Sequence, residues 1–101
     1  MLTLQQVLPY LNSEQVDTSD TAYLNAAVGA VSDYLEHYTN LTLDANAPLG
    51  LVQAAADMIT YQTTTRPHLK EMESEDMTLA FNTDYPAHLT KRLTHYRRVA
   101  W

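Results

Sequence analysis

The chain has 101 residues, a length that suits one domain burying roughly 65% of the surface of its unfolded form. It contains no cysteine, which excludes disulfides, thiolate metal sites and a cysteine nucleophile. Twelve acids against six lysines and arginines give a formal net charge of −6 at pH 7. This balance argues against general nucleic-acid binding, because phosphate contact requires a broad basic face.

The charges are divided unevenly along the chain. Twelve acids and only two bases leave residues 1–86 at −10, whereas the last fifteen residues carry four bases, no acid and hence +4. The four bases and the two neighbouring aromatic residues are Lys91, Arg92, Arg97, Arg98, Tyr96 and Trp101. Arginine, tyrosine and tryptophan dominate protein-binding hot spots. The pattern indicates a small domain that presents its C-terminal segment to a partner.

The first predicted element is a short helix over residues 4–11, where apolar residues recur with the i, i+3, i+4, i+7 spacing. Thr3 precedes the first of them and is a candidate N-cap. Pro9 lacks an amide hydrogen, so we expect it to kink or shorten this helix. The polar stretch 13–20 predicts a loop, and its end offers capping residues for the next helix: Asp17, Thr18, Ser19 and Asp20.

A long helix is predicted from Thr21 to Tyr38. Its apolar stripe consists of Leu24, Val28, Val31, Leu35 and Tyr38. An adjoining strip of small residues consists of Ala22, Ala26, Gly29 and Ala30. Glycine costs about 1 kcal/mol relative to alanine inside a helix, so close packing of another backbone is a physical reason for Gly29, and simple tolerance is the alternative.

The middle of the chain predicts a brief extended segment and a second long helix. Leu41 and Leu43 alternate with polar neighbours, as in a strand. Pro48 suits the first turn of a helix, and helical apolar spacing follows it. Residues 63–67 end this helix, because three threonines and the residue before a proline disfavour it.

Residues 68–84 differ in character from both long helices. An acidic group comes first and consists of Glu71, Glu73, Glu75 and Asp76. Three alternating apolar residues then point to one side of a strand: Met77, Leu79 and Phe81. One strand is not stable alone, so it pairs with residues 41–43, folds into a local hairpin or adds to an edge in a neighbouring subunit.

A short helix opened by Asp84, Tyr85 and Pro86 is predicted to end the fold. Leu89, Leu93 and Tyr96 share one of its faces. His88 and His95 could share another face and bind a metal or an acidic partner. The positive charge of the neighbouring lysine opposes a metal there, which favours a solvated or interface role for both histidines.

Motifs of catalytic chemistry are lacking. Gly29 and Gly50 are isolated, so no phosphate-cradling loop is present. No serine stands in a nucleophile elbow, and no histidine pair has the HExxH spacing. The acidic group lacks the glycine-centred loop of a calcium site. We therefore predict no enzyme, no metal and no cofactor, and also no signal peptide or membrane span.

Three stretches carry a family resemblance. The chain opens with LTLQQVLPYL (residues 2–11), the first long helix ends with DYLEHYTN (33–40), and the closing segment is DYPAHLTKRLTHYRRVAW (84–101). In these stretches and in the order of its elements, the sequence resembles the small head-to-tail connector proteins of tailed bacteriophages, also termed adaptor or head-completion proteins. The resemblance spans nearly the whole chain.

The resemblance implies a structural protein of the virion, synthesised in the bacterial cytoplasm, with no catalytic residues and no membrane contact. Such proteins form a ring of roughly a dozen copies below the portal protein. They also offer a docking surface to the next head-completion or tail protein. DNA passes through the ring without specific binding, and an acidic lumen would repel its phosphates.

We therefore predict an all-α fold, a bundle of three to four helices with an extended or β-like insertion near residues 68–84. It forms one domain over residues 1–101, with a basic helix and tail at 85–101. The predicted C-terminal anchor to a partner consists of Lys91, Arg92, Tyr96, Arg97, Arg98 and Trp101. Met77, Leu79 and Phe81 are predicted to contact another subunit, and the acidic group to face the channel. The alternative is a small interaction or regulatory module that contacts nucleic acid through the basic tail.

Overall fold

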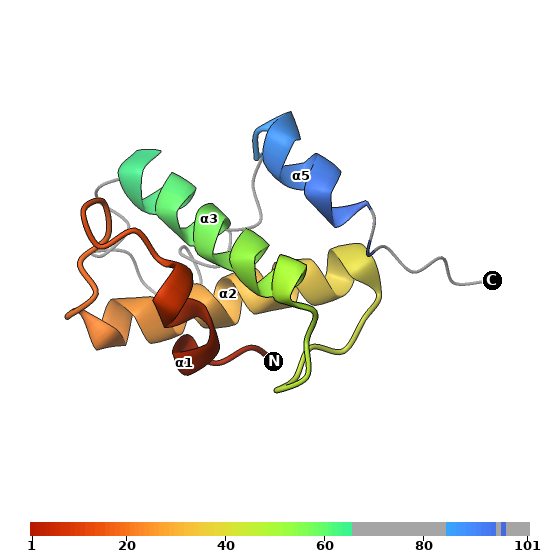
Figure 1. Cartoon of the computed structure of the whole chain (residues 1–101), viewed down its shortest axis with the longest axis horizontal. Coiled ribbons are helices and arrows are strands. Elements are labelled where there is room, and N and C mark those ends of the chain that lie inside the picture. Colours follow the sequence, from red (N-terminus) through yellow and green to blue (C-terminus); the bar gives the residue numbers. More distant parts are fainter. Residues whose placement is uncertain (66–84, 95, 97–101) are drawn as a thin grey trace.

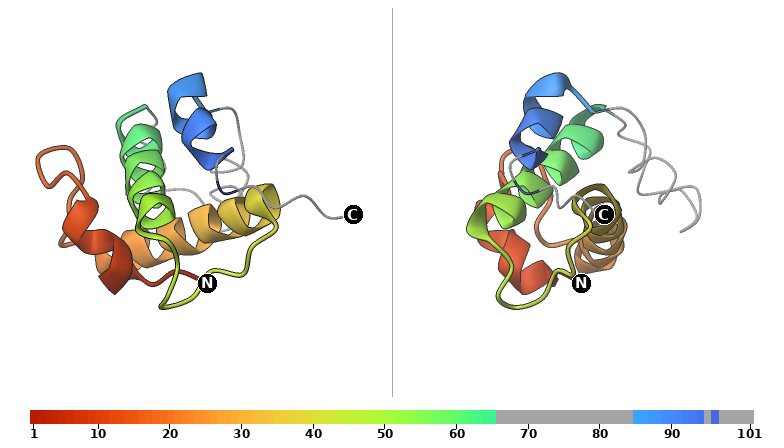
Figure 2. Two further views of the ribbon diagram at one scale, coloured as in Figure 1. Left: turned by 45° about the vertical axis from the view of Figure 1, so that its right-hand side comes forward. Right: turned by 90° about the vertical axis from the view of Figure 1, so that its right-hand side faces the viewer.

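The computed structural model describes residues 1–65, 85–94 and 96, and all regular structure within them is helical. The elements in chain order are α1 (Leu4–Val7), the 3-10 turn η1 (Leu8–Tyr10), α2 (Thr21–Thr39), α3 (Leu49–Thr65) and α5 (Ala87–Leu93). Helix α3 lies across α2, and α5 packs mainly on α3 (Figures 1 and 2). The all-α prediction is confirmed. The predicted insertion lies outside the described residues.

Helix α1 is short because Pro9 follows it, as the sequence predicts. Thr3 is the N-cap and forms a capping box with Gln6: the Gln6 amide donates to Thr3 Oγ1 at 3.4 Å, and the Thr3 amide donates to Gln6 Oε1 at 2.8 Å. Pro9 then falls in η1, where the α-helix has already given way to the tighter 3-10 turn. The expected shortening at Pro9 is confirmed.

Helix α2 begins and ends with local backbone devices. The Asp20 carboxylate accepts a hydrogen bond from the Tyr23 amide at 3.3 Å and caps the first turn. Asn40 adopts a left-handed conformation with φ of 58° and ends the helix. No other residue in the described part of the chain has positive φ. These two features fix the ends of α2 at Thr21 and Thr39, so the predicted helix Thr21–Tyr38 differs from the observed one by a single residue.

Helix α3 follows a proline and runs through the threonines. The Pro48 carbonyl accepts hydrogen bonds from the next turn, and the helix then continues as far as Thr65. Within it, the hydroxyls of Thr60 and Thr64 bond back to the carbonyls of Ala56 and Thr60 at 3.0 and 2.9 Å. Such bonds satisfy threonine inside a helix, so the helix reaches Thr65, within the range 63–67 that was predicted for its end.

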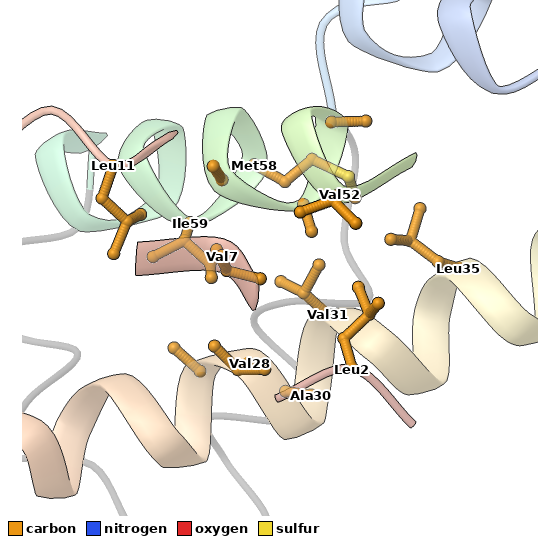
Figure 3. Packing of buried hydrophobic residues seen from close by; sticks show 14 of the residues in the cluster. Leu2, Val7, Leu11, Val28, Ala30, Val31, Leu35, Val52, Met58 and Ile59 are labelled. Carbon is orange, nitrogen blue, oxygen red and sulfur yellow. The ribbon is translucent and has the colours of Figure 1, made fainter. Parts of the chain in front are cut away.

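A single apolar core joins α1, α2, α3 and α5. Its fully buried large side chains include Val7, Val16, Leu24, Leu35, Leu43, Leu51, Met58, Ile59 and Leu93. In Figure 3, Val31 of α2 points toward Val52 of α3, and Val7 of α1 lies beside Ile59, between the two helices. The interhelical core therefore holds the N-terminal helix as well as the two long ones.

The strip of small residues on α2 does not support the close packing suggested for Gly29. Beyond its own helix backbone, no atom of the described residues lies within 4 Å of where a Gly29 Cβ would stand. Ala22 is exposed and Ala26 half-buried. Simple tolerance of the glycine accounts for Gly29 in the described part of the chain.

Candidate partner-binding site on the C-terminal helix

Three residues of the predicted C-terminal anchor, Lys91, Arg92 and Tyr96, are among the described residues. The remaining predicted site residues lie outside them: Arg97, Arg98 and Trp101 of the anchor, the apolar Met77, Leu79 and Phe81, and the acidic Glu71, Glu73, Glu75 and Asp76. The geometry of the candidate site therefore comes from α5, Tyr96 and the helix beneath them.

Helix α5 is fixed to the core by its apolar side. Leu89 and Leu93 are buried, with exposed fractions of 5% and 0%, in the core that α3 also lines. Pro86 precedes the helix, and its carbonyl accepts the Leu89 amide at 3.0 Å. Burial of these two leucines leaves Lys91 exposed and Arg92 half-exposed at the surface.

Arg92 is engaged within the chain. Its guanidinium forms an ion pair with the Asp57 carboxylate of α3. Both side chains are substantially exposed, at 40% and 48%, so the pair contributes about 0–1 kcal/mol to stability. Its main effect is to direct one cation of α5 toward α3 and to neutralise part of its charge.

Tyr96 lies against the first turn of α3. A Cβ added at Gly50 would stand 2.0 Å from Tyr96 Oη and 2.8 Å from Cζ, so the phenol occupies space that only glycine leaves free. Tyr96 is half-buried and packs on the core cluster. The sequence pattern placed Tyr96 on the Leu89 face but missed this contact, for which Gly50 in the first turn was the one available signal.

An open surface pocket of about 360 Å³ is lined by Gly50, Lys91, Arg92 and Tyr96 and is here called the basic cavity. Among the described residues, Lys91 is the only lysine and Arg92 the only arginine. The wall at Gly50 belongs to the amino-terminal turn of α3, where backbone amides carry positive partial charge. The cavity is thus suited to a negatively charged group.

A second feature is a group of tyrosines that joins three parts of the fold. The rings of Tyr34 and Tyr38 are stacked with centroids 6.0 Å apart, and Tyr85 lies 5.3 Å from Tyr34 and 6.0 Å from Tyr61. All four are half-buried. The sequence spacing could indicate only the contact between Tyr34 and Tyr38, which are four residues apart on α2. The group ties α2 and α3 to the segment that leads into α5.

The described residues contain no group of three or more histidine, aspartate or glutamate side chains placed to hold a metal ion. None of their helices combines the length and apolar character that a bilayer span requires. His88 is exposed on α5, and His95 lies outside the described residues.

Fold and site together define a small all-α protein whose described lysine and arginine lie where α5 meets α3. A family model described as phage gp6-like head-tail connector protein matches residues 2–97. The chain belongs to this family. No curated protein matches the chain, and no solved structure matches it. Family membership makes the protein a structural adaptor of the phage virion and implies interaction with portal and tail proteins.

Proposed function

We propose that the protein assembles as a closed ring of roughly twelve copies between the portal protein and the next head-completion or tail protein. The observation that carries this proposal is the family match over residues 2–97. The ring lines the channel through which DNA passes, and the subunits are synthesised in the host cytoplasm. Residues 1–101 form one domain, in keeping with the single core cluster of the described residues.

The charge of the chain suits a channel component. A net charge of −6 repels the phosphates of passing DNA, whereas a basic lumen would bind them. We assign the channel-facing role to the acidic group, Glu71, Glu73, Glu75 and Asp76. Replacing Glu71, Glu73 and Glu75 with lysine should slow DNA ejection, most strongly at low salt.

The partner contacts are assigned to two segments. The C-terminal anchor, Lys91, Arg92, Tyr96, Arg97, Arg98 and Trp101, binds the portal or an adjacent subunit. Arginine can pair bidentately with carboxylates of the partner, and the aromatic residues offer large apolar surfaces with few rotatable bonds. The three apolar residues Met77, Leu79 and Phe81 add to the contact between subunits.

The test is a truncation that separates binding from folding. Deleting residues 97–101 leaves α5 and its buried leucines intact, so helicity and melting temperature should change little. Loss of one hot-spot residue typically weakens binding by about 2 kcal/mol or more, and portal binding should fall at least thirtyfold. Replacing Arg97 and Arg98 with lysine keeps the charge and removes the bidentate geometry, so this full-length variant should also bind the portal less tightly, but with a smaller loss than the truncated protein.

The outcomes of this truncation are distinct. A folded truncated protein that binds the portal as tightly as the full chain would place the anchor elsewhere. An unfolded truncated protein would show that these residues belong to the core.

A further inference from the structure

The described surface is acidic except where α5 meets α3. Seven carboxylates lie among the described residues: Glu14, Asp17, Asp20, Asp33, Glu36, Asp44 and Asp57. Against them stand one lysine and one arginine, Lys91 and Arg92, consecutive residues that both line the basic cavity. Positive charge from lysine and arginine is thus confined to one corner of the described surface.

Of the two basic side chains at this corner, one forms an ion pair with a described carboxylate and the other does not. Arg92 is paired with Asp57. Lys91 is exposed and forms no ion pair with any carboxylate of the described residues. It therefore supplies a full positive charge to a cavity that Gly50 and the Tyr96 phenol also line. A carboxylate entering there would meet an ammonium group and a phenolic hydroxyl donor.

We propose that the basic cavity receives a carboxylate side chain from a neighbouring copy of this chain. This inference rests on the proposed ring and gives one contact within it. Closed rings are built from heterologous contacts, in which one face of a subunit meets a different face of the next. Identical acidic copies repel one another, and a contact that brings the basic cavity against a neighbour's carboxylates offsets that repulsion.

A protein carboxylate fits this cavity better than a DNA phosphate. Affinity for DNA grows with the number of phosphates that lysine and arginine neutralise. Here two cations are available among the described residues, one of them already paired, on a chain whose net charge is −6. The net negative charge of the chain therefore repels DNA at long range. At short range, the geometry of the basic cavity favours a single carboxylate.

Glu14 is the carboxylate that we assign to this contact. Figure 1 places the turn 12–20 at one end of the longest axis, while the C-terminal end of α5 points toward the other. Glu14 is exposed in that turn, and the Asn12 side chain fixes the turn by accepting the Glu14 amide at 3.0 Å. Subunits arranged head to tail bring Glu14 of one copy toward Lys91 of the next.

The test is a charge swap scored by assembly on purified portal protein, followed by sedimentation velocity. Lys91→Glu and Glu14→Lys should each weaken association about fivefold per contact at low salt, and less at high salt. The double variant E14K/K91E restores opposite charges at every contact and should recover assembly. The control is D33K/K91E, which has the same net charge but moves the new lysine to an exposed position on α2. It should remain impaired.

The results separate this contact from the ring itself. If the wild-type chain forms no ring on the portal, the proposed function fails and the contact fails with it. If the wild-type ring forms and Lys91→Glu assembles normally, or if the two double variants behave alike, only the contact is overturned. If Lys91→Glu lowers binding of a duplex DNA probe and leaves assembly unchanged, the cavity serves phosphate, and the proposal is likewise overturned.

Discussion

Replacing Gln62 with methionine should stabilise the protein. Gln62 lies on α3 with an exposed fraction of 1%, and neither its Nε2 nor its Oε1 has a hydrogen-bond partner within the described part of the chain. Burying a polar group without a partner costs about 1–3 kcal/mol. Methionine has a similar length and adapts its shape to an apolar site. We expect the free energy of unfolding to rise by about 1–2 kcal/mol.

Urea and thermal unfolding measure this change. In a domain of this size, 1 kcal/mol corresponds to roughly 4–8 °C in melting temperature. Gln53→Met is the matched control, because Gln53 is half-buried on the same helix, and it should alter stability by no more than about 0.5 kcal/mol. A loss of about 1 kcal/mol or more in Gln62→Met would refute the reasoning, since it would mean that the amide is paired in the folded protein.

Three further predictions concern one residue each of α5, α3 and α2. Leu93 is fully buried, so Leu93→Ala should lower the free energy of unfolding by about 2–5 kcal/mol in urea titration, and a loss below 1 kcal/mol would contradict its place in the core. Gly50→Ala forces the Tyr96 ring to move but gains helix propensity, so the Tyr96 ring resonances should shift while stability changes by less than about 1 kcal/mol. Burial raises the pKa of Tyr23 above 10.0, although its 2.7 Å hydrogen bond with Thr63 opposes the shift. The folded protein keeps this proton at a pH where the unfolded chain loses it, so stability should fall as pH rises above 10. The fall should be smaller in Tyr23→Phe, and equal slopes in the two proteins would contradict this.

Local chemistry in the sequence was sufficient to predict the helices. Thr3 caps α1, and Asp20, one of the predicted capping candidates, caps α2. Pro9 shortens α1. These features depend on residues within one turn of each other, so spacing alone reveals them. The family was also evident from three stretches of sequence, and the match over residues 2–97 confirms it.

The candidate site was only partly predictable. The sequence identified Lys91, Arg92 and Tyr96 as a group, but not that Arg92 would pair with Asp57 or that Tyr96 would fill the space above Gly50. Both contacts depend on the depth and angle at which α5 packs on α3, which no local pattern specifies. The sequence spacing places Gln62 on the apolar face of its helix, but the lack of a hydrogen-bond partner for its amide could not be predicted for the same reason.

The most direct test of the account is the mass and symmetry of the complex that the purified protein forms with its portal protein. Native mass spectrometry and electron cryomicroscopy together measure both. We expect one closed ring of roughly twelve copies on the portal, coaxial with its channel. A protein that stays monomeric beside a folded portal, or that binds it in scattered copies without closing a ring, would contradict the account.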